Sequence, residues 1–278
     1  MALLASLPAP WREGRLAPLG EGLTNCNYRL TLPSGQCGFL RCGHPEPVRL
    51  GIDRATEWQL YQGAMGQGIA LPCHHSDPAT GLMLLAWCEE PNWLLAPPPP
   101  DEQPRLLAEV LGRMHRLPVP RVVMAVRAHA RGYRDRLAQV PEWLPALERA
   151  LLASREPDDC WLPCHHDLNP ANLLGRKPWV IDWEYGAAGH PGFELASIVR
   201  THGWSEEQQR QLESCYLEGI GLEGAGEGHK LLNGKGFQAE AFLPWVDYIG
   251  LLWGLLMAEQ QPGPDYQALI DKNRRRLE

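Results

Sequence analysis

Hydrophobic and polar residues alternate in two short segments near the start of the chain, residues 26–32 and residues 37–42. The turn-forming residues Pro33, Ser34 and Gly35 separate them, and alternation on both sides of such a turn predicts a β-hairpin. Residues 52–65 then show the apolar spacing of a helix, and the apolar run over residues 81–87 predicts a buried strand. The first part of the chain therefore predicts the order strand, strand, helix, strand.

A proline-rich stretch at residues 96–104 ends this pattern, because neither a helix nor a central strand continues through consecutive prolines. Two apolar runs further on, residues 171–174 and 179–181, flank a turn and predict a second hairpin, while the glycine-rich residues 221–236 predict a loop. Helical spacing of Leu and Ala predicts helices over residues 105–116, 128–139, 144–154, 194–202, 206–218 and 239–261. The predicted fold class is α+β, with a small β-rich lobe at residues 1–88 and a larger, mainly helical lobe at residues 89–278.

Composition excludes several classes of protein. A net charge of −7 and a pI near 5.8 argue against a nucleic-acid-binding surface, which is usually basic. The N-terminus lacks the basic and apolar regions of a signal peptide, and residues 242–257 contain Pro244 and Asp247, which indicates a buried helix rather than a membrane span. Eight scattered cysteines without a CxxC pair predict reduced thiols, so we expect a cytoplasmic protein with no membrane or nucleic-acid partner.

The segment CHHDLNPANLLGRKPWVIDWEY, residues 164–185, carries the candidate chemistry. Asp167 lies in a loop before a short strand, Asn172 begins that strand, and Asp182 ends its hairpin partner. Because a hairpin brings its two ends together, the amide and the second carboxylate can face one cleft. Such a pair holds Mg²⁺ weakly and leaves the rest of its ligand shell to substrate phosphates. Asp167 stays outside the pair and can orient an attacking hydroxyl or accept its proton, as in phosphoryl transfer.

These residues carry a family resemblance. His165-x-Asp167-x4-Asn172, followed by Asp182, resembles the catalytic loop and metal loop of the protein-kinase-like fold. The segments HHDLNPANLL and VIDWEYGAAGHPGFELA resemble sequences of the aminoglycoside phosphotransferase and choline kinase superfamily. Within it, IDWEY is most similar to the corresponding segment of choline/ethanolamine kinases and bacterial thiamine kinases. The resemblance extends to GLTNCNYRL (residues 22–30), FLRCG (39–43) and IDRATEW (52–58) in the first lobe.

The resemblance implies a role for each matching residue. Asp167 would be the catalytic base, Asn172 and Asp182 would bind Mg²⁺, and His165 would brace the loop. Arg41, in place of the lysine of most kinases, would contact the phosphates of ATP and pair with Glu57. The remaining nucleotide contacts would come from the glycine turn and from the strand end that follows it, at Gly20, Gly22, Thr24, Asn25, Leu85 and Trp87. The short segment after Asp182 has no room for an activation loop, which favours a small-molecule acceptor over a protein.

A cationic acceptor would need aromatic faces and a carboxylate. The predicted helix near the C-terminus places Trp245 and Tyr248 three residues apart, with Asp247 between them. We therefore predict a cation-binding group made of Trp245, Tyr248 and either Glu184 or Asp247, with Trp253 and residues 189–194 nearby. Core packing is the alternative interpretation of each aromatic side chain.

The function predicted on these grounds is an ATP- and Mg²⁺-dependent kinase, monomeric or homodimeric, that phosphorylates a small cationic alcohol. Thiamine ranks first and choline or ethanolamine second. Three alternatives remain open: an aminoglycoside or aminosugar kinase, a kinase-like nucleotide-binding protein without turnover, and a zinc protein. The zinc alternative rests on Cys-His-His at residues 73–75 and again at 164–166. The segment GHKLLNGKG, residues 228–236, resembles a P-loop, but its glycine spacing is one residue too long.

Overall fold

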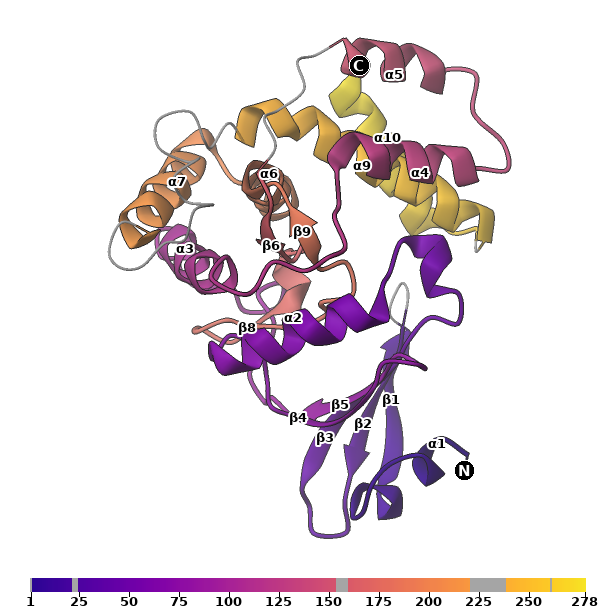
Figure 1. The fold of residues 1–278 in the computed structure, drawn as a ribbon, viewed down its shortest axis with the longest axis vertical. Coiled ribbons are helices and arrows are strands. Elements are labelled where there is room, and N and C mark those ends of the chain that lie inside the picture. Colours follow the sequence, from indigo (N-terminus) through magenta and orange to yellow (C-terminus); the bar gives the residue numbers. More distant parts are fainter. Residues whose placement is uncertain (1, 22–24, 154–159, 221–238, 261) are drawn as a thin grey trace.

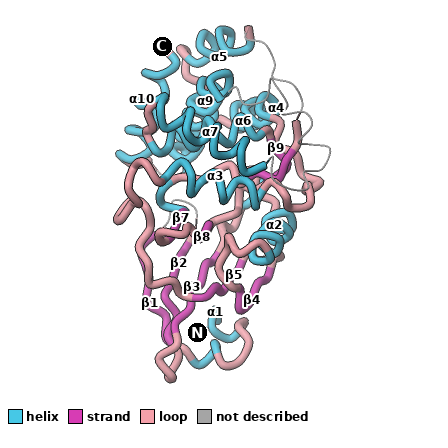
Figure 2. Tube along the Cα trace, turned by 90° about the vertical axis from the view of Figure 1, so that its left-hand side faces the viewer, coloured by secondary structure: helices cyan, strands magenta, loops and turns pink. Residues whose placement is uncertain are grey.

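The computed structural model describes residues 2–21, 25–153, 160–220, 239–260 and 262–278. The predicted glycine-rich loop and the P-loop-like segment both fall within residues 221–238, outside the described residues. The chain forms two lobes, with an antiparallel sheet at one end and helices at the other (Figures 1 and 2). The predicted α+β class and two-lobed arrangement are confirmed, whereas a lobe boundary at residues 88/89 stays a prediction.

The first lobe contains a five-stranded sheet in the order β1-β2-β3-β5-β4, with antiparallel neighbours. Its strands are β1 (Arg15–Glu21), β2 (Cys26–Thr31), β3 (Cys37–Cys42), β4 (Cys73–Asp77) and β5 (Leu82–Ala86). The predicted hairpin is β2 and β3, and the predicted buried strand is β5. The sequence reading missed β1 and β4, which are the two edge strands. Edge strands are partly exposed, so β1 tolerates Pro18 and β4 consists of Cys-His-His-Ser-Asp.

Helix α2 (Arg54–Gly66) lies between the sheet and the helical lobe (Figure 1). It begins where the Asp53 carboxylate accepts a hydrogen bond from the Thr56 amide at 2.7 Å, which satisfies one of the first free N–H groups of the helix. Its apolar side chains Leu60 and Tyr61 join the main core, while its polar residues Arg54 and Glu57 are also buried.

The second lobe contains the predicted helices at nearly the predicted positions: α3 (Gln103–Met114), α4 (Val126–Arg136), α5 (Leu144–Leu152), α6 (Pro191–His202), α7 (Glu206–Ile220) and α9 (Ala239–Gln260). Helix α3 begins inside the proline-rich stretch, because Pro104 occupies the first turn, where a missing N–H costs nothing. The sequence analysis missed α10 (Pro264–Leu277), whose polar sequence buries only Tyr266, Ile270 and Asn273.

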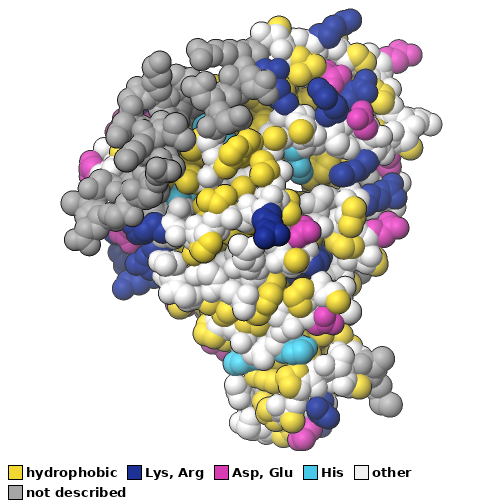
Figure 3. Space-filling model, in the orientation of Figure 1, with side chains coloured by type: hydrophobic (Ala, Val, Ile, Leu, Met, Phe, Trp, Pro, Cys, Tyr) yellow, Lys and Arg dark blue, Asp and Glu magenta, His cyan; other side chains and the backbone are white. Residues whose placement is uncertain are grey.

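Helix α9 is central to the second lobe and packs against α4, α6 and α10. Among the described residues it alone has the length and mean hydropathy of a membrane-spanning helix, and half of its most apolar stretch is buried inside the structure. Lys and Arg side chains are interspersed with Asp and Glu on the face shown in Figure 3.

Two pairs of short strands lie beneath these helices and shape the loops of the site. Strands β6 (Leu162–Cys164) and β9 (Ala187–Gly189) form one antiparallel pair, and β7 (Leu173–Leu174) and β8 (Trp179–Val180) form the predicted second hairpin. The main core is continuous from α2 and β5 into the helical lobe, so the two lobes share one apolar interior.

Candidate active site

The loop between β6 and β7 holds Asp167 by side-chain hydrogen bonds. Asn169 Nδ2 donates to Asp167 Oδ1 at 2.8 Å, and Asn172 Nδ2 donates to Asp167 Oδ2 at 2.9 Å. Asn169 also caps the turn of 3₁₀ helix Pro170–Asn172 by accepting from the Ala171 amide. Burial raises the pKa of Asp167 to about 7, because desolvation disfavours the charged carboxylate more than the two amides stabilise it. The carboxylate is thus fixed in position, and its pKa lies near neutral pH.

The β7–β8 hairpin places Asp182 beside Asn172. The Ile181 amide donates to the Asn172 carbonyl at 3.0 Å, and Asp182 follows with a φ of 60°. That left-handed conformation is uncommon for a residue other than glycine, and here it turns the chain at the end of the hairpin. Asn172 and Asp182 both line the same cavity as Asp167. The predicted meeting of these three side chains at one cleft is present.

His165 braces this arrangement from behind. Its Nε2 contacts the Ile181 carbonyl oxygen at 3.0 Å, its Nδ1 accepts from the Asp167 amide at 3.2 Å, and its ring packs edge-on against Trp183. Burial lowers its pKa to about 4, so the imidazole is neutral and donates from Nε2. The side chain therefore ties the start of the Asp167 loop to the end of the hairpin, as the sequence predicts.

Arg41 links the sheet to the hairpin. Its guanidinium forms an ion pair with Glu57 of α2 and donates from Nη1 to Asp182 Oδ1 at 3.1 Å. The predicted pairing of Arg41 with Glu57 is present, and both side chains are buried. A planar guanidinium reaches two carboxylates at once, which a lysine ammonium does less well.

A second arginine, which the sequence analysis did not single out, extends this network. Arg54 Nη1 donates to Glu57 at 2.8 Å and to Glu184 at 3.3 Å, and Asn25 Nδ2 donates to Glu184 at 2.9 Å. Glu184 thereby holds the turn before β2 and the start of α2 against the helical lobe. The two buried guanidinium groups pair with three carboxylates, Glu57, Asp182 and Glu184, and a fourth carboxylate, Asp167, lines the same cavity.

The numbers of carboxylates and guanidinium groups indicate whether the site can accept a divalent cation. When all four carboxylates are ionised, they exceed the two guanidinium groups by two negative charges. Burial, and after it the neighbouring carboxylate of Glu184, raises the pKa of Asp182 to about 8. Asn172 uses its Nδ2 on Asp167, so its amide presents the oxygen atom to the cavity. One carboxylate oxygen and one amide oxygen are hard ligands that fit Mg²⁺.

The cavity has a volume of about 630 Å³ and is lined by residues of both lobes and by Asp167. Its lining differs between the side of the sheet and the side of the helices. The part beneath the sheet is lined by Phe39, Arg41, Met83, Leu85 and Ile181. The part beneath the helices is lined by Val122, Met124, Tyr133, Tyr185, Phe193, Val246, Ile249, Trp253 and Leu269. The lining of the first part is apolar except for Arg41, and the second part is a recess lined by aromatic and aliphatic side chains.

The residues predicted to contact the nucleotide differ in whether they line the cavity. Asn25 and Leu85 line the cavity, whereas Gly22 and Thr24 lie outside the described residues. Trp87 does not line the cavity, because its ring stacks under the Arg29 guanidinium at 4.6 Å. Glu57 is buried behind Arg41 and acts on the cavity through that arginine.

The predicted cation-binding group of Trp245, Asp247 and Tyr248 is not formed. These three side chains are almost fully buried and do not line the cavity, while Asp247 is already paired with Arg200 at 2.8 Å and Arg276 at 3.2 Å. Helix α9 turns a different face to the cavity, the one carrying Val246, Ile249, Gly250 and Trp253. The pairing of residues 245 and 248 had the correct helical spacing but the wrong face of the helix.

An aromatic pair elsewhere faces the recess. Trp253 Nε1 donates to the Tyr185 hydroxyl at 3.1 Å, and both rings line the cavity. Tyr185 belongs to the segment IDWEY, and a spacing of seven residues from Val246 places Trp253 on the same side of α9. The sequence alone does not select Trp253 over Trp245, because it does not show which side of the helix faces the cavity.

Comparison with known proteins gives consistent results. Residues 15–230 match the family described as "Phosphotransferase enzyme family". Protein LicA of Haemophilus influenzae is 28% identical over 211 residues, which cover 70% of this chain and 60% of that protein. The matches span less than two thirds of the length of that protein and of a LicA homologue from Mycoplasma capricolum.

Two solved structures cover nearly the whole chain. A choline/ethanolamine kinase family protein from Mesorhizobium loti is 25% identical with a TM-score of 0.70, over 99% of this chain and 91% of that one. The choline kinase LicA from Streptococcus pneumoniae is 18% identical with a TM-score of 0.74, over 95% and 91%. The fold described above is therefore one that kinases of small alcohols also have.

Proposed function

The chain belongs to the phosphotransferase enzyme family, and we propose that it transfers the γ-phosphoryl group of ATP to the hydroxyl of a small cationic alcohol of the choline class. One observation carries this proposal: Asp167, Asn172 and Asp182 line a single cavity together with an aromatic recess large enough for a small acceptor. The names of the similar proteins, choline kinase and choline/ethanolamine kinase, support the same class of acceptor.

The proposed reaction needs little covalent chemistry from the protein. The acceptor hydroxyl attacks the γ-phosphorus, the bond to the bridging β–γ oxygen breaks, and the hydroxyl proton passes to Asp167. Asn169 and Asn172 keep that carboxylate aimed into the cavity. Arg41 holds Asp182 in place and lies where it can contact the nucleotide phosphates. Mg²⁺ held by Asn172 and Asp182 would neutralise charge on the phosphates during transfer.

Electrostatics do not oppose a cation in the acceptor recess. Burial lowers the pKa of His129, which also lines the cavity, to about 4. His129 is therefore neutral at pH 7 and adds no repulsion. Aromatic faces such as those of Tyr185 and Trp253 attract a desolvated cation by about 0.5–2 kcal/mol.

The same recess discriminates among cations. Glu184 is engaged by Asn25 and Arg54, so it does not offer a free carboxylate to an ammonium group. A primary ammonium that enters an apolar recess loses hydrogen bonds to water, whereas a quaternary ammonium has no N–H to leave unpaired. We therefore rank choline above ethanolamine and polycationic aminoglycosides. Thiamine, first in the sequence-based ranking, moves to second place, because no similar protein named above is a thiamine kinase.

An ADP-release assay across choline, ethanolamine, thiamine, aminosugars and aminoglycosides tests this ranking. We expect Mg²⁺-dependent release with choline at a kcat/KM at least about tenfold above that with ethanolamine, which corresponds to about 1.4 kcal/mol of differential binding. Stabilisation by Mg²⁺–ATP without ADP release from any acceptor would instead identify a nucleotide-binding protein without turnover.

Replacing Trp253 with leucine is expected to raise the KM for the preferred cation by about tenfold while the KM for ATP stays within a factor of about two. The reason is the loss of one aromatic face from the recess and none from the nucleotide part. Trp143→Leu is the matched control, because Trp143 faces Arg274 at 4.6 Å and does not line the cavity. Equal KM values for the two variants would place the cation elsewhere.

A further inference from the structure

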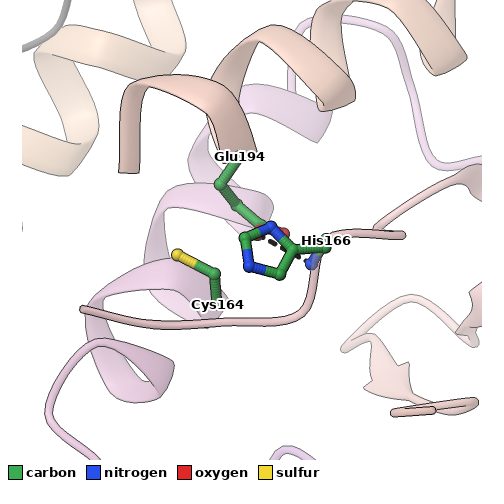
Figure 4. A group of neighbouring side chains, drawn as sticks. All are labelled: Cys164, His166 and Glu194. Carbon is green, nitrogen blue, oxygen red and sulfur yellow. Dashed lines mark hydrogen bonds and ion pairs between the residues drawn. The ribbon is translucent and has the colours of Figure 1, made fainter. Parts of the chain in front are cut away.

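A second cluster of reactive side chains lies behind the catalytic loop, and it arises from the Cys-His-His sequence at residues 164–166. Cys164 ends β6, and His166 follows two residues later with a φ of 65°. His165 points away, toward the Ile181 carbonyl. Cys164 and His166 meet the side chain of Glu194 from α6 (Figure 4).

The cluster is buried and its hydrogen bonding is incomplete. The side chains of Cys164 and Glu194 are fully buried, and that of His166 is 4% exposed. Glu194 Oε2 accepts from the His166 amide at 2.8 Å. Within the part of the chain that the structure describes, Glu194 Oε1 and both ring nitrogens of His166 have no hydrogen-bond partner. Buried polar atoms without partners are costly, and an ion is one of the groups that satisfies them.

We propose that Cys164, His166 and Glu194 bind a structural zinc ion, with His115 as the fourth ligand. The donor atoms of the first three residues all lie within 4.8 Å of one another, and His115 Nε2 lies 4.0 Å from the Cys164 sulfur. Neighbouring sulfur and nitrogen ligands of a tetrahedral zinc ion lie about 3.5 Å apart, so the site forms by a contraction of about 1 Å. Sulfur, imidazole and carboxylate ligands together suit zinc and not Mg²⁺.

Two further features match a closed zinc site. His115 Nδ1 is hydrogen-bonded to the Tyr216 hydroxyl, which directs Nε2 toward Cys164, in the way that outer partners usually orient zinc-bound histidines. A thiolate and a carboxylate together balance the two charges of the ion, so the buried site is neutral overall. The ion would join α3, β6 and α6 directly behind the loop that carries Asp167.

Metal analysis of the purified chain tests the proposal without nucleotide or acceptor, so its outcome is independent of the proposed kinase activity. We expect about one zinc ion per chain by elemental analysis. After replacement by Co²⁺, we expect the near-ultraviolet sulfur-to-cobalt absorption and the visible bands of a tetrahedral thiolate site. Removal of the ion should lower the melting temperature by roughly 5 °C or more.

Two variants locate the site. Cys164→Ser should abolish the sulfur-to-cobalt band and lower the zinc content at least tenfold, and His166→Asn, which tolerates a positive φ, should lower the zinc content similarly. Cys160→Ser is the matched control, since Cys160 is a buried thiol outside the cluster, and it should keep the full zinc content. A wild-type chain with neither zinc nor a cobalt–thiolate band overturns the proposal, and so does a Cys164→Ser variant that keeps its zinc. If a variant does not fold, the cobalt spectrum of the wild-type chain decides alone.

Discussion

Replacing Asp167 with alanine is expected to lower kcat by about 10³-fold or more, in the range of losses seen when a positioned acid or base is removed. The carboxylate lines the cavity in which an acceptor hydroxyl and a γ-phosphate would meet. Burial raises its pKa to about 7, which suits a group that must take up a proton near neutral pH.

The substitution leaves the rest of the site largely intact. Asn172 Nδ2 also donates to the Asp167 backbone carbonyl at 2.9 Å, and alanine retains that carbonyl. The dissociation constant for Mg²⁺–ATP should therefore change by less than about threefold, because the substitution removes a group that acts in the transition state and not in nucleotide binding. Isothermal titration with nucleotide and single-turnover kinetics with the acceptor separate the two quantities.

Asp135→Ala is the matched control for this variant. Asp135 is an exposed carboxylate on α4, and among the described residues its one ion-pair partner is Arg134. It should retain the wild-type kcat. If Asp167→Ala turned over the true acceptor at the wild-type rate, Asp167 would not be the proton acceptor, and the attacking hydroxyl would have to be oriented by another group.

The sequence predicts the elements that have strong patterns and the residues that a short motif places together. The β2–β3 hairpin, the main helices and the meeting of Asp167, Asn172 and Asp182 depend on interactions between residues close in the chain, and strand β5 is recognised by its apolar run. Edge strands β1 and β4 escape prediction because their partly exposed surfaces do not require alternation. Helix α10 escapes for a similar reason, because it buries a narrow apolar face.

The errors in the candidate site have one common cause, which is that its partners are remote in the chain. The sequence shows that α9 carries aromatic residues, but which of its faces lines the cavity depends on packing against α4, α6 and α10. Asp247 therefore pairs with Arg200 and Arg276 instead of binding a ligand. The omission of Arg54 has the same cause, because its partner Glu184 is 130 residues away and no local pattern links the two.

Replacing Asp182 with asparagine is expected to raise the Mg²⁺ concentration that gives half-maximal activity by about 100-fold or more. Loss of even an indirect partner of a metal ion costs about 10–100-fold, and a direct charged ligand should cost at least as much. Asparagine keeps the shape of the side chain and an oxygen atom toward Arg41, so the change removes charge without opening a cavity.

The melting temperature of the metal-free Asp182→Asn variant should not fall, although its activity does. Burial and the nearby Glu184 raise the pKa of Asp182 to about 8, so the ionised carboxylate is unfavourable in the folded chain when no cation is bound. The metal-free Asp182→Asn variant should therefore melt at a temperature no lower than that of the wild-type chain, whereas Mg²⁺–ATP should stabilise it much less.

Measurements of melting temperature with and without Mg²⁺–ATP, and of activity across a Mg²⁺ titration, check both parts of this prediction. Asp101→Asn serves as the control, because Asp101 is an exposed carboxylate ahead of α3. A variant that lost activity together with several degrees of stability in the metal-free state would show that Asp182 is needed for folding through its contact with Arg41. A variant with unchanged Mg²⁺ dependence would remove Asp182 from the metal site, because a ligand charge cannot be deleted without weakening the binding of a divalent cation.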